Sequence, residues 1–267
     1  MANIKCELYH DNNQNFKQYN IPKAQLILTD IPYNIAENAY ASNPQWYEGG
    51  DMSNGQSEFA GKTFFARDEY FKCAEFMHFA TQILRPEPKE VNQAPCMIVF
   101  CNHQQFNTLI TYAEKYGFKH YQLLCFIKDY SPQVLKANMR IVGATEYALL
   151  FYRDKLPKFR NKGKMIFDWF RWSKDDKMIP KIHPTQKPIA VLSKLIETFT
   201  DKGDVVVDPC AGSASTLRAA YMLERNSFGF EVDGKIYHQA KTLMLNQEDL
   251  SATARRYKEK NEEYTLF

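Results

Sequence analysis

Three acidic residues stand where short apolar runs end, and their side chains could bind one ligand together. Asp30, Asp208 and Glu231 directly follow the runs at 25–29, 205–207 and 228–230. Runs of this length and composition are typical of buried strands. Open α/β sheets bind their ligands beyond the carboxyl ends of the strands. We therefore expect the three carboxylates to share a site.

The turn after Asp208 has the composition of a ligand-binding loop. The run 211–214 consists of small residues, and Gly212 among them allows the backbone to approach a ligand closely. Glu231 follows Asp208 by 23 residues, and an acidic residue at about this spacing can accept hydrogen bonds from ribose hydroxyls. The pattern indicates a cofactor with a nucleoside part. A purely structural strand-to-helix turn remains the alternative when only the spacing is considered.

Alternating strands and helices would position these residues. Buried strands are expected at 25–29, 96–100, 121–127, 147–152, 205–207 and 228–230. Helices are expected at 68–84, 106–116, from Pro188 to about 199, at 215–223, after Glu231 and at about 251–260. The alternation predicts an α/β fold with a mostly parallel, doubly wound sheet. We expect a single domain of residues 1–267 with a long flexible loop at about 38–62.

Three motifs carry a resemblance to a known family. Asp30-Ile31-Pro32-Tyr33 resembles the DPPY motif of the amino-methyltransferases, and residues 183–188 read HPTQKP, as in the same family. Residues 208–216 resemble its DPFAGSGTT loop. The order, with the catalytic tetrapeptide first, is that of the beta-class DNA amino-methyltransferases. The resemblance implies a Rossmann-like, S-adenosylmethionine-dependent methyltransferase fold that is circularly permuted, with the catalytic half first.

The resemblance also implies a reaction, the methylation of an exocyclic base amine in DNA. Such an amine is a poor nucleophile because its lone pair is delocalised into the ring. Asp30 and the backbone carbonyl of Pro32 would accept its hydrogens, and Tyr33 would stack on the base after it has left the duplex. In the family an aspartate at the first position goes mostly with adenine N6. Cytosine N4 remains the alternative, as does an inactive relative that only binds DNA.

Several residues are implied to surround the cofactor, S-adenosylmethionine. Thr185 and Lys187 would hold its carboxylate, because a carboxylate binds a hydroxyl and a cation. Glu231 would bind the ribose and Asp11 the adenine, although a surface role for Asp11 is an equal alternative. The full cofactor-binding set is Asp11, Asp30, Thr185, Lys187, Asp208, Cys210, Gly212, Ser213 and Glu231.

Three positions depart from the family pattern. Ile31 replaces the first proline of the tetrapeptide and removes the rigidity of its ring. Cys210 replaces an aromatic residue, and Ala214 replaces a glycine. If position 214 has a positive φ, alanine costs roughly 1 kcal/mol or more there. These departures bear on cofactor affinity more than on the fold.

A basic segment with aromatic residues separates the two halves of the chain. In the beta-class order, residues 153–182 form a small target-recognition insertion. Double-stranded DNA is the expected partner, and the residues expected to contact it are Lys158, Arg160, Lys162, Lys164 and Arg171. A solvated, charged excursion of the chain is the alternative.

Composition excludes several classes of protein. No apolar run in the 267 residues approaches the roughly 20 residues that span a bilayer. The first residues lack the apolar core of a signal peptide, and a cytoplasmic location in a bacterial or phage-infected cell is expected. The six cysteines show no ligand spacing, so we predict neither a disulfide framework nor a metal site. The sequence leaves open whether the chain forms a homodimer and whether it has a cognate restriction enzyme.

Overall fold

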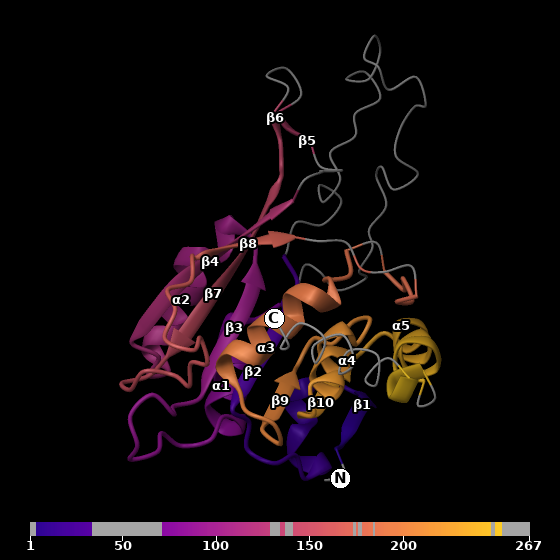
Figure 1. The fold of residues 1–267 in the computed structure, drawn as a ribbon, viewed down its shortest axis with the longest axis horizontal. Helices are drawn as coiled ribbons and strands as arrows, with labels where there is room; N and C mark the ends of the chain where they lie inside the picture. Colours follow the sequence, from indigo (N-terminus) through magenta and orange to yellow (C-terminus); the bar gives the residue numbers. More distant parts are fainter. Residues whose placement is uncertain are drawn as a thin grey trace.

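An eight-stranded sheet lies at the centre of the structure (Figure 1). The computed structural model describes residues 4–33, 71–128, 134–136, 141–172, 175, 178–183, 185–246 and 249–252. Along the sheet the strands follow the order β1-β10-β9-β2-β3-β7-β4-β8. They are β1 (Cys6–His10), β2 (Leu26–Asp30), β3 (Cys96–Cys101), β4 (His120–Lys128), β7 (Thr145–Tyr152), β8 (Trp169–Trp172), β9 (Val205–Asp208) and β10 (Asn226–Glu231).

The remaining elements are helices and one small hairpin. The helices are the 3-10 turns η1 (Asn13–Tyr19) and η4 (His103–Gln105), the α-helices α1 (Cys73–Ile83), α2 (Phe106–Lys115), α3 (Ile189–Phe199), α4 (Ser215–Met222) and α5 (Gly234–Gln239), and the π-helix η6 (Ala240–Met244). Strands β5 (Val134–Lys136) and β6 (Ile141–Val142) pair with each other and stand away from the main sheet, at the top of Figure 1.

The order of the strands reverses between β2 and β9. The neighbouring strands from β1 to β3 are all parallel, whereas β7 is antiparallel to both β3 and β4. From β2 the chain continues to β3 on one side, and it later adds β9 and β10 on the other side. Ligands of doubly wound sheets bind at such a reversal. The predicted α/β fold with a mostly parallel sheet is confirmed.

Helices cover both faces of the sheet. Ile27 packs with Phe76 of α1 and Leu109 of α2 in one core. Its neighbours Leu26 and Leu28 belong to a second core, with α3 and α4, on the opposite face. Strands that are buried on both faces read as continuous apolar runs. This is why the central strands could be predicted from the sequence.

Two edge strands were missing from the sequence prediction. In β1 only Leu8 is buried, and in β8 only Trp172 is buried. Both segments mix polar and apolar residues because one face of each is partly exposed. The basic segment 153–182 is therefore not wholly an insertion, since it contributes β8, which pairs in parallel with β4.

Some sequence predictions fall outside the described residues. These are the loop at 38–62, the start of the helix predicted at 68–84, and most of the helix predicted at 251–260. Among the residues that the structure describes, no helix is long and apolar enough to cross a membrane.

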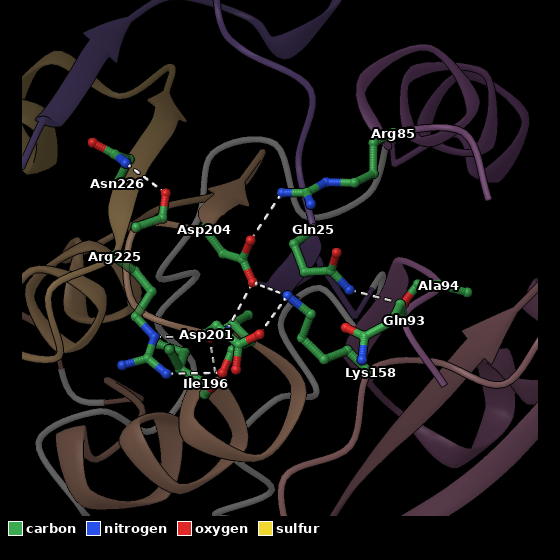
Figure 2. Close-up of polar contacts among 12 residues, drawn as sticks. Gln25, Arg85, Gln93, Ala94, Lys158, Ile196, Asp201, Asp204, Arg225 and Asn226 are labelled. Carbon is green, nitrogen blue, oxygen red and sulfur yellow. Dashed lines mark hydrogen bonds and ion pairs between the residues drawn. The ribbon is translucent and has the colours of Figure 1, made fainter. Parts of the chain in front are cut away.

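A cluster of ion pairs joins three segments at the amino ends of the parallel strands (Figure 2). The ammonium of Lys158 lies 2.8 Å from the Asp201 carboxylate and 2.6 Å from the Asp204 carboxylate. The Arg85 guanidinium contacts the other oxygen of Asp204 at 3.0 Å. The Lys158 side chain is only 7% exposed. The cluster therefore ties the segment after β7 to the start of β9 and to the end of α1.

We expect Lys158→Met to destabilise the fold. The variant leaves two carboxylates without one of their cations, and loss of hydrogen bonds to charged groups should lower the free energy of unfolding by about 1–3 kcal/mol. Urea titrations would measure this, with Lys194→Met, a change at an exposed lysine of α3, as the control. Equal stabilities of the two variants at pH 7 would contradict the structural role of Lys158.

The loss should also depend on pH. Hydrogen bonding to Arg160, and also to Lys158, holds the pKa of Asp201 well below its ordinary value. A depressed carboxyl pKa stabilises the fold above the unfolded pKa of about 3.9, and this contribution fades as the pH falls further. The difference between wild type and Lys158→Met should therefore shrink below about pH 4.

Candidate active site

Four carboxylates lie at the carboxyl ends of four neighbouring parallel strands. Asp11 directly follows β1, while Glu231, Asp208 and Asp30 end β10, β9 and β2, which are consecutive neighbours. In the register of the parallel strands, His10 is opposite Glu231. The expected grouping of the strand-end carboxylates is confirmed, and the reversal between β2 and β9 lies within it.

Asp30, whose side chain is 31% exposed, forms a partly buried ion pair with Lys187. The Lys187 ammonium contacts Asp30 Oδ2 at 2.5 Å, and the lysine side chain is 8% exposed. Burial raises the pKa of the Asp30 carboxyl above its ordinary value, and Lys187 limits this rise. Burial acts to lower the pKa of Lys187, but the carboxylates of Asp30 and Glu146 outweigh it and raise that pKa. The lysine therefore stays protonated beside the carboxylate.

The other oxygen of Asp30 is a buried acceptor without a donor. Among the described residues, no group donates a hydrogen bond to Asp30 Oδ1. A buried acceptor without a partner is costly, and a ligand donor at this position would remove the cost. Asp30 therefore offers one oxygen to Lys187 and one to a ligand.

The backbone of the tetrapeptide is fixed on both sides of the peptide bond that joins Ile31 to Pro32. The Ile31 N–H donates to the Phe100 carbonyl at 3.2 Å, which continues the pairing of β2 with β3 by one residue. The Pro32 carbonyl accepts a hydrogen bond of 2.9 Å from the side-chain amide of Gln105. Proline has no N–H and could not make the first of these bonds. Ile31 thus replaces ring rigidity by a sheet hydrogen bond.

Tyr33 is held by a second carboxylate, which the sequence analysis did not identify. The Tyr33 hydroxyl donates to Glu146 Oε2 at 3.1 Å, and Lys128 contacts Glu146 Oε1 at 2.5 Å. Burial acts to raise the pKa of Glu146, but Lys187 and Lys128 hold it below its ordinary value. Glu146 lies on β7 and Lys128 ends β4, so the antiparallel part of the sheet contributes to the site.

Aromatic rings enclose the ammonium of Lys187. Its Nζ lies 5.5 Å from the ring centre of Tyr33, 5.4 Å from that of Phe100 and 5.8 Å from that of Trp172. Lys128 lies 4.9 Å from the Trp172 ring on β8. Rings at this range stabilise cations. The site therefore holds two carboxylates and two ammonium groups among aromatic side chains.

Asp208 organises the turn between β9 and α4. Its Oδ1 accepts hydrogen bonds from the Thr29 hydroxyl at 2.7 Å and from the Cys210 N–H at 3.1 Å. Burial raises the pKa of Asp208 to about 6. The bond to Thr29 ties the turn to β2, beside Asp30.

The glycine-containing turn has left-handed backbone at two positions, Gly212 and Ala214. Gly212 has a φ of +50°, and its N–H donates to Glu231 Oε2 at 2.9 Å. The other Glu231 oxygen accepts from the Asp233 N–H at 2.7 Å, and burial raises the pKa of this glutamate. The Ser213 hydroxyl contacts that of Ser215 at 2.9 Å. Ala214 has a φ of +61°, so alanine does stand in a left-handed position there.

Thr185 belongs to a hydrogen-bonded turn before α3. The Thr185 N–H donates to His183 Nδ1 at 3.2 Å, so this nitrogen is an acceptor, and the Thr185 hydroxyl lies 2.8 Å from it. Burial lowers the pKa of His183 to about 4, which keeps the ring neutral. Gln186 closes the turn, accepting from the Ile182 N–H and donating to the Pro180 carbonyl.

Asp11 is held by its neighbours in η1. Its carboxylate accepts hydrogen bonds from the Asn12 N–H, the Asn15 amide and the Tyr19 hydroxyl at 2.7–2.8 Å. The hydrogen bond from Tyr19 is the largest cause of the lowered pKa of Asp11. The carboxylate therefore stays ionised at this edge.

Two of the predicted DNA contacts need correction. Lys158 is buried between aspartates, and Arg160 forms two hydrogen bonds of 2.7 Å with Asp201. Both lie at the amino ends of the strands, opposite the edge that carries Asp30. Their pairing with aspartates at this end of the sheet assigns them a structural role.

The other three basic residues are exposed, and exposed aromatic side chains are close to them in the sequence. Lys162, Lys164 and Arg171 are exposed. Phe167 and Trp169 are 72% and 45% exposed, and their stacked ring centres are 5.6 Å apart. We call these five residues the basic–aromatic surface. Trp169 and Arg171 belong to β8, whose last residue, Trp172, contacts Lys128 and Lys187.

We expect the Asp30–Lys187 pair to show strong coupling in a double-mutant cycle. Lys187→Met leaves the Asp30 carboxylate without its cation beside the carboxylate of Glu146. Breaking a fully buried pair costs about 3–5 kcal/mol, and this partly exposed pair should cost less. Adding Asp30→Asn removes the unpaired charge, so the double variant should lose less stability than the two single losses combined. Urea unfolding at pH 7.5 would measure all four proteins. Additive losses would contradict the pairing.

A family model described as DNA methylase matches residues 24–242. The DNA adenine methyltransferase YhdJ of Escherichia coli is 30% identical over 128 residues, which are 45% of this chain and 42% of that protein. Other matched stretches cover 26% of a type II methyltransferase of Moraxella bovis and 59% of a methylase of E. coli, YubD, described as putative. The chain thus spans less than two thirds of the length of these curated relatives.

Solved structures share the fold. The structure of M1.HpyAVI matches with a TM-score of 0.62 at 22% identity, over 90% of this chain and 98% of that chain. A structure titled as its complex with SAM matches with a TM-score of 0.59. The cytosine-N4-specific PvuII DNA methyltransferase matches with a TM-score of 0.63 at 15% identity, over 95% of this chain and 93% of that chain. The fold is that of the S-adenosylmethionine-dependent DNA methyltransferases, and the chain belongs to the DNA methylase family.

Proposed function

We propose that this chain transfers a methyl group from S-adenosylmethionine to N6 of an adenine flipped out of double-stranded DNA. Membership of the DNA methylase family supports the class of reaction. The observation that carries the methylation of an amine is the buried, unpartnered oxygen of Asp30, two residues before the Pro32 carbonyl. These are two acceptors for one amine with two hydrogens.

The two acceptors explain how a poor nucleophile is activated. The amine donates one hydrogen to Asp30 Oδ1 and the other to the Pro32 carbonyl, which draws the nitrogen toward tetrahedral geometry. Its lone pair then points out of the ring plane, toward the reacting methyl carbon. The N–C bond forms as the C–S bond breaks, and the methylated nitrogen sheds one proton. Asp30 is the nearest base, and its raised pKa favours accepting that proton.

The residues along the edge fit the cofactor. The cofactor supplies an electrophilic methyl group on a positively charged sulfur, and an edge rich in carboxylates favours such a cation. Glu231 can accept from ribose hydroxyls, since each carboxylate oxygen holds a second lone pair beyond its backbone bond. Asp11, Asp208 and the turn at 210–213 complete the proposed cofactor-binding set.

Lys187 and Thr185 remain in the proposed cofactor-binding set, but Lys187 also has a second role at Asp30. The ammonium of Lys187 binds Asp30, so its first role is to fix the catalytic carboxylate. Thr185 closes the turn that carries this lysine. The carboxylate of the cofactor would accept a hydrogen bond from another N–H of the same ammonium.

The basic–aromatic surface is the proposed DNA contact. Lys162, Lys164 and Arg171 would neutralise phosphates, which carry most of the affinity of such interfaces. Phe167 and Trp169 add stacking surface, which exposed bases bind without regard to sequence. Tyr33 would stack on the flipped base, with its ring fixed by the bond to Glu146.

Adenine is preferred over cytosine because Asp30 stands first in the tetrapeptide. YhdJ, the relative that is 30% identical, is named an adenine methyltransferase. PvuII, which shares the fold, is titled cytosine-N4-specific, and both amines need the same acceptors. Cytosine N4 is therefore the second outcome that the test must distinguish. A homodimer and a restriction partner stay predictions.

Incubation with tritiated S-adenosylmethionine and genomic DNA from a host without DNA methylases should label the DNA. Mass spectrometry of the nucleosides should identify N6-methyladenine. Asp30→Ala should lower kcat at least about 100-fold, because it removes an acceptor used in the transition state. Asp154→Ala, at an exposed aspartate paired with Lys119, is the matched control.

The outcomes separate the hypotheses. N4-methylcytosine would replace the adenine assignment and keep the chemistry. Cofactor binding without transfer, together with DNA binding, would identify an inactive relative. A fully active Asp30→Ala variant would contradict the assigned acceptor.

DNA binding should weaken with salt, and the slope should depend on the basic–aromatic surface. Removing Lys164 and Arg171 by alanine substitution should reduce the slope of log K against log salt by about 1 for each phosphate that the protein then leaves unneutralised. Fluorescence anisotropy with duplex DNA would measure this, with Lys194→Ala as the control. An unchanged slope in the double variant would place the DNA elsewhere.

A further inference from the structure

A side-chain hydrogen bond joins β2 to β9 at the reversal of the sheet. The Thr29 hydroxyl donates to Asp208 Oδ1 at 2.7 Å, across 179 positions of sequence. Thr29 is 1% exposed and Asp208 is 3% exposed. Hydrogen bonds to an ionised carboxylate are shorter and stronger than those between neutral groups. The contact is therefore suited to fixing the two strand ends that carry Asp30 and the cofactor turn.

The bond lies where the backbones of the two strands separate. The backbone pairing of β2 with β9 ends at Ile27 and Val207. Past this point β2 continues to pair with β3 as far as Asp30, and β9 pairs with β10 at Asp208. Ligands of doubly wound sheets bind where neighbouring strands part in this way. The Thr29 hydroxyl thus bridges β2 and β9 beside the proposed site and limits how far they can move apart.

Asp208 depends on its donors for its charge. Burial is the largest influence on this carboxyl and raises its pKa to about 6. The hydroxyls of Thr29 and Thr216 act in the opposite direction, as does the Cys210 N–H, whereas the charge of Asp30 raises the pKa further. Burial also raises the pKa of the Cys210 thiol, which keeps it neutral. Asp208 is therefore a negative charge at neutral pH, and Thr29 helps to maintain it.

We propose that Thr29 is a positioning residue for the cofactor, whose hydroxyl fixes the Asp208 carboxylate for the positively charged cofactor and sets the distance between the cofactor and Asp30. The proposal rests on the proposed function, because it assumes that Asp208 belongs to the cofactor-binding set. Thr29 touches neither the cofactor nor the target base in this role. It acts through Asp208.

Thr29→Val is a sharp test, because it replaces the hydroxyl by a methyl group and keeps a β-branched side chain. Asp208 then loses one donor, and the side-chain bridge between β2 and β9 is broken. We expect the Kd for S-adenosylmethionine to rise about three- to tenfold at pH 7.5, as measured by isothermal titration calorimetry. At saturating cofactor kcat should fall about tenfold, because small errors of position at reacting groups are costly.

Three further variants serve as controls. Thr29→Ser keeps the hydroxyl and should bring Kd and kcat back to within about threefold of wild type. Thr111→Val makes the same change at an exposed position of α2 and should leave both values unchanged. Thr29→Ala removes the hydroxyl without crowding Asp208, and it repeats the comparison if the valine variant does not fold.

A pH series separates positioning from a packing defect. Losing the hydroxyl raises the pKa of Asp208 above its wild-type value of about 6, and the carboxyl attracts the cofactor cation only when it is ionised. The ratio of variant to wild-type Kd should therefore grow about threefold or more between pH 8 and pH 5.5. Asp30 and Glu231, the other carboxylates near this turn, keep their own donors in both proteins. A packing defect would raise Kd by the same factor at every pH.

Each outcome decides the proposal. Unchanged Kd and kcat in Thr29→Val, a Kd ratio that is constant with pH, or a serine variant as weak as the valine variant would overturn the positioning role and leave the proposed function intact. A wild-type chain that does not bind S-adenosylmethionine would overturn both. If wild type binds the cofactor but transfers no methyl group, the proposed reaction fails, and the pH dependence of Kd still decides the role of Thr29. A folded variant whose binding weakens further at low pH is the result that supports the role.

Discussion

The ion pair between Lys187 and Asp30 connects the two halves of this chain, which are 157 residues apart in sequence. It joins the end of β2, which lies between β9 and β3, to the turn before α3. The pair occupies one oxygen of Asp30 and leaves the other buried and without a donor among the described residues. The rings of Tyr33, Phe100 and Trp172 pack around the same ammonium. One contact therefore sets both the charge and the shape of the site.

Around this pair, the tetrapeptide is held by its neighbours and not by its own stiffness. The Ile31 N–H extends the pairing with β3, Gln105 holds the next carbonyl, and Glu146 holds the Tyr33 hydroxyl. The partners come from β3, η4 and β7, so each residue of the motif is fixed by a different element. A sheet hydrogen bond can thus replace a proline ring, because both restrict the backbone at the nitrogen of residue 31. The isoleucine at position 31 therefore changes how the backbone is held, but the Asp30 carboxylate and the Pro32 carbonyl are still present.

How far the sequence could predict the site depended on the direction of the strands. Asp30, Asp208 and Glu231 could be brought together because parallel strands end at the same edge. Glu146 and Lys128 could not, because they are brought in by β7, which runs antiparallel, and by β4, which is adjacent to it. For Lys158 and Arg160 the sequence led to a wrong prediction, because both were expected to contact DNA. A local excess of basic residues does not reveal that Asp201 and Asp204, more than 40 positions away, neutralise two of them.

Ala214 shows what the cofactor turn retains when its sequence changes. Its φ of +61° is the conformation that a glycine would adopt freely, so the backbone has kept its path despite the Cβ atom. A left-handed residue costs about 1–2 kcal/mol, and several bonds hold the turn against this strain. Asp208 accepts from Thr29 and from the backbone after it, and the Gly212 N–H reaches Glu231. The carboxylates proposed to bind the cofactor are therefore also the groups that maintain the turn. Cofactor affinity at this loop should follow from those hydrogen bonds more than from the identity of residue 214.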